Sequence, residues 1–239
     1  MSLKGEKMII ATWNMLGATN AVYLDPVLQQ TRANVLCLQE CGSNFATLLE
    51  ERAPIIGNDG AIIGYTGNFR VRADFMECVY WEAPQDRLGL AVLSNIAPSE
   101  RHILMPAAAG FNPNSPRAMP WCTVTDPQTR NAITIYSIHS PPVSRNVTLA
   151  NVCTWNNAQI GQISQLGGTW ACVGDFNAPP NAAGFVPPPQ GAVVSSNRAT
   201  QQGGGILDYA ITNAPGFTFS QAGTQLVGAS DHYPQSFRW

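Results

Sequence analysis

The chain has 239 residues, of which 45% are apolar, and it carries a formal net charge of −2 at pH 7. This apolar content suits a folded core and excludes a disordered polymer, while no apolar run reaches the roughly 18 residues that a membrane-spanning helix needs. The mild negative charge argues against a surface coated in positive potential, although it does not by itself exclude a nucleic-acid substrate.

The first residues, 1–7, contain two lysines and no apolar stretch, so they lack the pattern of a secretory signal. We expect a short leader over 1–7 and a single domain over 8–239. Two explanations stay open: the protein is cytosolic, or a signal has been removed and a short leader stands in its place.

Nine short runs rich in β-branched and aromatic residues, most of them bounded by Gly, Pro, Asn or Asp, predict strands. In chain order they are Met8–Trp13, Asn34–Gln39, Phe75–Trp81, Leu88–Ser94, Met119–Thr125, Ala132–His139, Thr169–Gly174, Ile206–Thr212 and Tyr233–Trp239. Three segments predict helices from apolar spacing or a capping residue: Ala21–Ala33, Phe45–Arg52 and Asn146–Leu166. Strands outnumber helices, which favours two packed sheets with helices outside them over a doubly wound sheet.

Six cysteines occur without a CxxC pair or zinc-ligand spacing. Cys37, Cys78, Cys122 and Cys172 lie inside predicted strands, where a thiol behaves as a small hydrophobic group. We therefore expect inert buried thiols. One disulfide stays open, but the pattern does not identify its partners.

Polar motifs stand where predicted strands end. They are Thr12-Trp13-Asn14, Leu38-Gln39-Glu40, Ser137-Ile138-His139-Ser140, Gly174-Asp175-Phe176-Asn177 and Ser230-Asp231-His232-Tyr233-Pro234, with Leu207-Asp208-Tyr209 between the last two. A single polar residue at a strand end is usually a turn or a cap, so only the whole set is informative.

The set holds four carboxylates, at Glu40, Asp175, Asp208 and Asp231. If the strands are neighbours, these groups converge at one edge, where they repel one another and favour a bound cation. Oxygen ligands point to a hard ion such as Mg²⁺, which would also offset their negative charge. A hard ion with histidine and amide side chains suits hydrolysis of a phosphate ester.

The order of these motifs resembles the endonuclease/exonuclease/phosphatase family, which includes pancreatic-type deoxyribonuclease. The resemblance runs from Thr12 to Pro234 and implies a DNase I-like catalytic domain over 8–239. The fold class that the resemblance implies is α+β, a four-layer α/β sandwich of two packed mixed sheets flanked by helices. Three segments are similar, more narrowly, to the catalytic B subunits of cytolethal distending toxins: Thr200–Tyr209, Gly89–Ser94 and Ala229–Pro234.

The resemblance implies a metal site that takes Mg²⁺ and accepts Mn²⁺ as a substitute. Glu40 corresponds to the principal metal ligand, with Asn14 and Asp231 close to the ion. No transmembrane segment is expected.

The resemblance also implies catalytic roles. Asp175 and Asn177 correspond to the pair that holds the attacking water and the phosphate. His232, whose ring Asp208 orients, corresponds to a general base or phosphate ligand, and whether it or Asp175 takes the proton stays open. His139 corresponds to the second histidine, which protonates the leaving oxygen or stabilises the phosphoryl charge.

Four further residues have two possible interpretations each. Arg117 corresponds to an arginine of the toxin subunits that contacts phosphate, although its flanking sequence differs and a solvated loop arginine is an equal alternative. Glu77 lies where pancreatic-type deoxyribonuclease places a carboxylate beside its second histidine, but the toxin subunits lack that residue. Arg145 is more simply a solvated helix start, and His102 a surface or half-buried strand residue.

The function that the resemblance implies is a DNA endonuclease, secreted as the active subunit of a toxin with separate delivery subunits and acting inside host cells. A phosphoinositide phosphatase on the same fold is the alternative, and a catalytically dead binding module fits poorly because no expected site residue is missing. The discriminating feature is where the scattered arginines lie: Arg70, Arg72, Arg87, Arg117, Arg130, Arg145 and Arg198.

Overall fold

The computed structural model describes residues 7–17, 21–71, 74–83, 88–106 and 117–239. The expected leader, apart from Lys7, and the arginines Arg72 and Arg87 lie outside these residues. Among the helices of the described chain, none is both long and apolar enough to cross a membrane.

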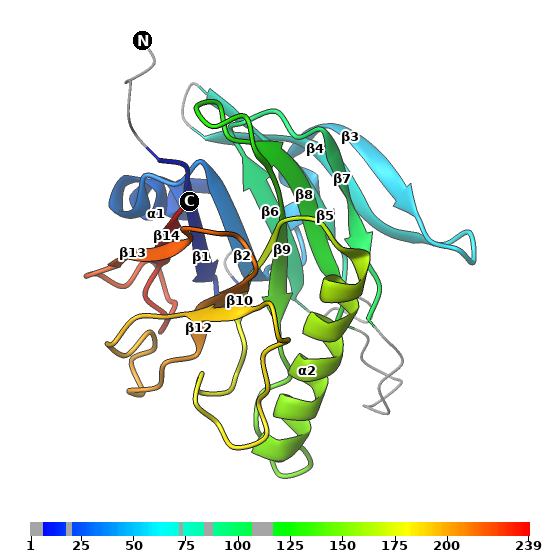
Figure 1. The fold of residues 1–239 in the computed structure, drawn as a ribbon. Helices are drawn as coiled ribbons and strands as arrows, with labels where there is room; N and C mark the ends of the chain where they lie inside the picture. Colours follow the sequence, from blue (N-terminus) through cyan, green and yellow to red (C-terminus); the bar gives the residue numbers. More distant parts are fainter. Residues whose placement is uncertain (1–6, 18–20, 72–73, 84–87, 107–116) are drawn as a thin grey trace.

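Two β-sheets form the centre of the described chain (Figure 1). The first has the order β13 (Thr218–Ala222), β14 (Gln235–Arg238), β1 (Ile9–Asn14), β2 (Val35–Cys41), β6 (Gly89–Ser94), β5 (Asp74–Trp81), β4 (Ile62–Val71) and β3 (Leu49–Ile56). The second has the order β11 (Ala192–Val194), β12 (Asp208–Thr212), β10 (Trp170–Asp175), β9 (Ala132–His139), β8 (Met119–Thr125) and β7 (Glu100–Leu104). Each sheet is mixed, because β1 runs parallel to β2 and β9 parallel to β10 while the other pairs are antiparallel.

Two α-helices cover the outer faces of the sheets. A 3₁₀ turn, Ala21–Tyr23, leads into α1 (Leu24–Thr31), and α2 (Leu149–Leu166) lies along the second sheet beside β8 and β9 (Figure 1). The Thr148 hydroxyl starts α2 by accepting a hydrogen bond from the backbone N–H of Asn151 at 3.2 Å. The result is the predicted four-layer arrangement of helix, sheet, sheet and helix.

The core has three parts because successive side chains of a strand point to opposite faces of its sheet. In β1, Ile10 packs between the sheets, whereas Ala11 and Trp13 pack on the outer face under α1. A third cluster fills the space between the second sheet and α2, with Tyr209 and Phe176 stacked at 4.1 Å between ring centroids. Inward-facing positions near the strand ends are therefore the ones that can build a shared site.

The helix predicted over Phe45–Arg52 is wrong. Only Phe45–Leu48 forms a 3₁₀ turn, and the chain then continues as β3, the outermost strand of its sheet. Most of β3 is exposed, so it lacks the alternation that marks a half-buried strand. The sequence also did not predict β7, β11 and β13, which are short strands at the sheet edges. Nor did it predict β4, which pairs with β3 in a long hairpin.

The thiols of Cys37 and Cys172 lie buried in central strands. Cys37 and Cys172 are fully buried and free, and burial raises the pKa of both thiols well above its ordinary value. Because the thiolate is the reactive form, we predict that a thiol reagent labels neither residue in the native protein at neutral pH. Peptide mapping after brief labelling checks this, with denatured protein, in which all six cysteines should react, as the control. Rapid native labelling of both would show that the core is not closed.

Candidate active site

The two sheets meet at the ends of their central strands. Asn14 ends β1 and Asp175 ends β10, and the Asn14 amide Nδ2 donates a hydrogen bond to Asp175 Oδ2 at 3.1 Å across the sheet interface. In the second sheet, Asp175 is paired with His139 on one side and Asp208 on the other. Strand order thus brings Asn14 and Asp175, which are 161 positions apart, into contact.

Close backbone packing brings β10 against β9. Gly174 precedes Asp175, and a Cβ atom at this glycine would lie 2.0 Å from the carbonyl oxygen of Ile138. No larger residue fits there without a backbone shift. The glycine of the Gly-Asp-x-Asn motif therefore sets the spacing of the strands that carry Asp175 and His139.

Glu40 reaches the site through a break in strand alternation. Continued alternation along β2 would place its side chain on the outer face with Leu36 and Leu38. Instead, Glu40 has a left-handed backbone with φ of 52°, and the pairing of β2 with β6 shifts register between Leu38 and Cys41. The Glu40 carboxylate lies 3.4 Å from the Nε2 atom of His139. A left-handed non-glycine residue costs about 1–2 kcal/mol, so packing must hold this conformation in place.

Two buried histidines face the same carboxylate oxygen. Asp175 Oδ2 lies 3.7 Å from His139 Nε2 and 3.9 Å from His232 Nε2. On its other ring nitrogen, His232 Nδ1 is hydrogen-bonded to Asp208 Oδ2 at 2.8 Å. Asp231 Oδ1 lies 3.7 Å from His232 Nε2. The histidines, separated by most of the second half of the chain, therefore flank one point.

Asp175 is the most strongly constrained carboxylate of the group. Its Oδ1 accepts a hydrogen bond at 2.9 Å from the backbone N–H of Asn177, which also has a left-handed φ of 47°. Burial and the charge of Asp208 raise the pKa of Asp175 to about 7, even though His232, the Asn177 N–H and the Asn14 amide favour its ionised form. The cluster thus carries more negative charge than its donors balance.

The same surroundings move the two histidines in opposite directions. Burial lowers the pKa of His232, but the hydrogen bond and charge of Asp208, with the charges of Asp175 and Asp231, outweigh it and raise this pKa to about 9. Burial, together with the positive charges of Arg117 and His232, lowers the pKa of His139 well below its ordinary value. Without a bound metal, His232 is therefore the cation and His139 the neutral ring at pH 7.

The donor set fits a divalent cation. Ligand atoms of Asp175, Asp208 and His232 lie within 4.8 Å of one another, and the Asp208 Oδ1 atom is buried with no hydrogen-bond partner among the described residues. Excess negative charge and oxygen donors suit a hard ion.

The three residues predicted as metal ligands surround this cluster. Glu40 lies beside His139, Asp231 lies beside His232, and Asn14 is bonded to Asp175 between them. Two of these residues have further polar contacts: Asn14 Oδ1 accepts from the Leu16 N–H at 3.0 Å, and Asp231 Oδ2 accepts from the Gln201 amide at 3.0 Å. The compact group of ligand atoms within the described chain is thus different from the predicted set.

Arg117 is hydrogen-bonded to the backbone at the end of the His139 strand. Its guanidinium donates to the backbone carbonyl oxygens of His139 at 3.2 Å and of Ser140 at 3.0 Å. The predicted phosphate contact is untested, but the charge of Arg117 lies close enough to depress the pKa of His139.

The other residues that were weighed lie apart from the site. Glu77 forms an ion pair with Arg101 of β7, near the far end of the first sheet, so it is not the carboxylate beside His139; Glu40 is. His102 and Arg145 are both exposed, His102 on the edge strand β7.

The sequence did not predict the role of Ser140, which forms hydrogen bonds to three segments around the site. The Ser140 N–H donates to the Asp175 carbonyl at 2.8 Å, its own carbonyl accepts from the Asn177 amide at 2.8 Å, and its hydroxyl donates to Asn156 of α2. The Asn156 amide in turn donates to the Phe176 carbonyl at 3.1 Å. The available signal was Asn156 itself, a polar residue on the buried stripe of α2.

Comparison with known proteins identifies the family. The model of the endonuclease/exonuclease/phosphatase family matches residues 11–232, which include every motif of the site. The chain belongs to this family. Its members are hydrolases that act on phosphoester bonds, and they generally depend on a divalent metal. No curated protein sequence gives a significant match.

Solved structures share the fold of this family member. The Haemophilus ducreyi cytolethal distending toxin structure has a TM-score of 0.68 at 21% identity, with 97% of each chain covered. The toxin from Actinobacillus actinomycetemcomitans has 0.64 at 21% identity, covering 96% of this chain and 97% of that one. A mannosyl-6-phosphatase from Bacteroides thetaiotaomicron has 0.63 at 13% identity, covering 97% and 98%. At these identities the likeness establishes the fold only.

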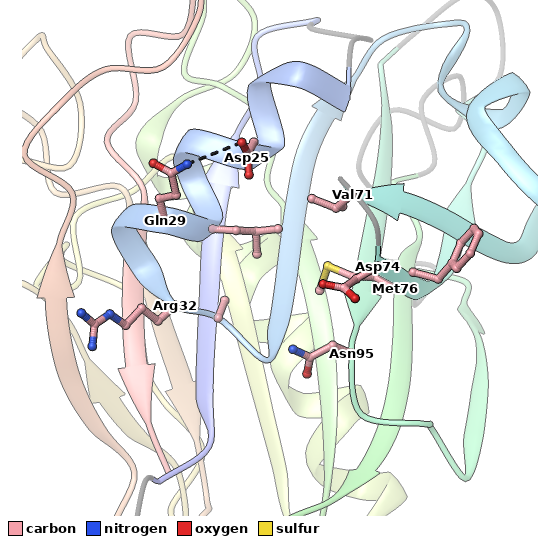
Figure 2. Close-up of a pocket in the computed structure, with 10 residues that line it drawn as sticks. Asp25, Gln29, Arg32, Val71, Asp74, Met76 and Asn95 are labelled. Atoms are coloured by element: carbon pink, nitrogen blue, oxygen red, sulfur yellow. Dashed lines mark hydrogen bonds between the residues drawn. The ribbon is translucent and has the colours of Figure 1, made fainter. Parts of the chain in front are cut away.

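A separate hollow of about 320 Å³ lies at the other end of the first sheet (Figure 2). Side chains of α1, including Asp25 and Leu28, line one side, and Val71 and Met76 of β4 and β5 line another. It also touches Asn95, which follows the end of β6 that lies farthest from Glu40. The hollow is therefore distinct from the catalytic cluster.

We predict that Mg²⁺ raises the melting temperature of this protein and that Glu40→Gln reduces the increase. A ligand that binds only the folded state stabilises it in proportion to RT ln(1 + [L]/Kd), and loss of one carboxylate weakens binding. Thermal scans at 0 and 10 mM Mg²⁺ measure both increases. Glu82→Gln, which alters an exposed carboxylate just after β5, two strands away from β2, is the matched control. An equal Mg²⁺-dependent increase in melting temperature for the two variants would show that Glu40 is not a metal ligand.

Proposed function

We propose that this family member is a magnesium-dependent DNA endonuclease. One observation carries the proposal: His139 and His232 place their Nε2 atoms 3.7 and 3.9 Å from the same oxygen of Asp175. Two ring nitrogens facing one acidic point can contact a single phosphate from two sides. Hydrolysis of a phosphodiester needs groups on both the attacking and the leaving side.

In the proposed reaction, water attacks phosphorus and forms a new P–O bond while the bond to the leaving oxygen breaks. The proton of the water passes to Asp175 in its ionised form, or to His232 once that ring has lost its own proton to solvent. Asp208 holds His232 by the 2.8 Å hydrogen bond at Nδ1, so that Nε2 faces the reaction. The leaving oxygen takes up a proton from solvent water to give a free hydroxyl, and the phosphate remains on the other product.

We assign His139 to the phosphoryl oxygens rather than to proton donation. Its lowered pKa favours a neutral imidazole, which is a poor acid but keeps one N–H donor. A neutral donor facing the phosphate stabilises negative charge that grows in the transition state.

Glu40, Asn14 and Asp231, which surround the compact group of Asp175, Asp208 and His232, would hold Mg²⁺ with Asp175 next to them. Within that compact group, His232 and Asp208 are already hydrogen-bonded to each other. When bound there, the ion supplies Lewis-acid stabilisation of negative charge on the phosphate and the leaving oxygen. It would also balance the carboxylates whose repulsion raises the pKa of Asp175.

DNA is the proposed substrate because the chain resembles the toxin subunits in the segment Thr200–Tyr209 and shares their fold. By the same resemblance, we propose that it acts inside host cells as the active subunit of a secreted toxin with separate delivery subunits. A phosphatase with this fold, the Bacteroides mannosyl-6-phosphatase, makes phosphomonoesters such as phosphoinositides the second candidate substrate class.

We predict that nicking of supercoiled plasmid DNA requires a divalent ion. EDTA should abolish nicking, and Mg²⁺ or Mn²⁺ should restore it, because the clustered carboxylates cannot approach a phosphate without a cation. Phosphate release from phosphoinositides, measured in parallel, tests the second substrate class. Undiminished nicking in EDTA would refute the metal dependence, and phosphate release without nicking would assign the site to phosphomonoesters.

The two site histidines should respond to substitution differently from His102. We predict that His139→Gln and His232→Gln each lower plasmid turnover by roughly 10²–10⁴-fold with melting temperature nearly unchanged, since each acts in one chemical step. The variant with both substitutions should lose far less turnover than the product of the two single fold-losses. His102→Gln, on an exposed edge strand, is the control. Site variants as active as this control would leave the fold without the proposed chemistry.

A further inference from the structure

The buried residue Thr200 connects the two segments that carry Asp208 and His232. It opens the glycine-rich stretch Thr200–Gly205, which precedes β12, and it is completely buried. The hydroxyl and backbone groups of Thr200 form hydrogen bonds with residues next to or within the Asp208–His232 pair, and with Gly205 in the turn before β12.

The hydroxyl holds the Asp208 side of the pair. Thr200 Oγ1 accepts hydrogen bonds from the backbone N–H of Leu207 at 2.9 Å and from that of Asp208 at 3.0 Å. The first donor immediately precedes β12 and the second is its first residue, Asp208. Without this acceptor the N–H of Asp208 would be buried unpaired, which is costly.

The backbone of the same residue holds the His232 side. The Thr200 carbonyl accepts from the N–H of Tyr233 at 2.8 Å, and the next residue, Gln201, forms an isolated antiparallel bridge with His232. Gln202 continues the pairing by donating its N–H to the Asp231 carbonyl at 2.8 Å. The segment 200–202 thus runs against the segment 231–233 as a short two-stranded clamp.

The glycines close this clamp into a tight turn. The Thr200 N–H donates to the Gly205 carbonyl at 2.8 Å, and the Gly204 N–H donates to the Gln201 carbonyl at 3.0 Å. Gly204 has a φ of 91°, a conformation that side-chain-bearing residues rarely adopt. The turn therefore returns the chain to β12 within a few residues of the clamp.

From these contacts we propose that Thr200 is a positioning residue for the reaction, which fixes the Asp208–His232 pair through its hydroxyl and its carbonyl. This inference rests on the proposed function for its kinetic consequences, but the positioning itself is a property of the fold. Thr200 does not touch the substrate; it acts by keeping His232 Nδ1 on Asp208 and its Nε2 toward Asp175.

Thr212 provides a matched control on the same strand. It is also buried, and its hydroxyl also accepts a backbone N–H, that of Ala214 at 2.9 Å, while donating to the Trp170 carbonyl at 2.6 Å. It lies at the opposite end of β12, away from Asp208. Thr212→Val therefore loses a comparable set of hydrogen bonds without any link to the pair.

The kinetic experiment compares plasmid nicking by Thr200→Val, Thr200→Ser and Thr212→Val at saturating Mg²⁺. We expect Thr200→Val to lower kcat about 10- to 100-fold with KM little changed, as for other outer residues that orient a catalytic ligand. Thr200→Ser should retain activity because it keeps the hydroxyl, and Thr212→Val should match the wild type. If Thr200→Val does not fold, Thr200→Cys, which keeps a weak acceptor of similar size, replaces it with a smaller expected loss.

A double-variant comparison separates positioning from general loss of stability. In an Asp208→Asn background the Asp208–His232 pair is already disrupted, so adding Thr200→Val should lower kcat little further. An equal fold-loss in both backgrounds would overturn the proposal, because it would show an effect that does not pass through Asp208.

A proton NMR measurement tests the positioning without any activity. The hydrogen-bonded Nδ1 proton of His232 should give a downfield signal, assigned by its absence in His232→Gln. We expect Thr200→Val to abolish or shift this signal, and Thr200→Ser and Thr212→Val to keep it. An unchanged signal in Thr200→Val would refute the proposal. If the wild-type protein cleaves no DNA, the proposed function fails, and this signal alone still decides the role of Thr200.

Discussion

The burial of Asp175 at the junction of the two sheets is the constraint on which the site depends. A buried carboxylate without partners is expensive, so its neighbours must supply hydrogen bonds or charge. The chain does this from both sheets at once, with the Asn14 amide from the first and the Asn177 N–H from the second. These donors do not fully balance it, as its raised pKa indicates. The remaining imbalance is what makes the site receptive to a cation.

A buried polar network directly beneath the site keeps the sheets in register. The Thr12 hydroxyl donates to Gln39 Oε1 at 2.9 Å, the Gln39 amide donates to Ser137 Oγ at 3.0 Å, and Ser137 Oγ donates to the Leu38 carbonyl at 3.2 Å. Such contacts are satisfied in only one alignment of the sheets, whereas apolar packing tolerates several. Since Gln39 and Ser137 directly adjoin the strand ends of Glu40 and His139, the network helps to hold these residues opposite each other.

The two histidines show how one environment produces two chemical states. Both are buried, and burial lowers the pKa of each. His232 recovers its proton because Asp208 is bonded directly to its ring, while His139 has a cationic neighbour in Arg117 and only a longer contact to Glu40. A division of roles between proton transfer and charge stabilisation follows from these neighbours, not from the residue type.

Local sequence patterns were enough to predict which polar residues lie at or beside the ends of the central strands. Strand periodicity and turn residues are local properties, so β8 and β9 were predicted with their observed bounds and most other inner strands to within two residues. The resemblance in motif order predicted the family and its four-layer sandwich fold. Tertiary structure decided the rest: the direction of Glu40 depends on a left-handed residue and a register shift, and the edge strand β3 has no buried face to produce a pattern. The contacts of Thr200 and Arg117 were likewise undetermined, because each depends on segments that meet only after the sheets have paired, and no local pattern records such a meeting.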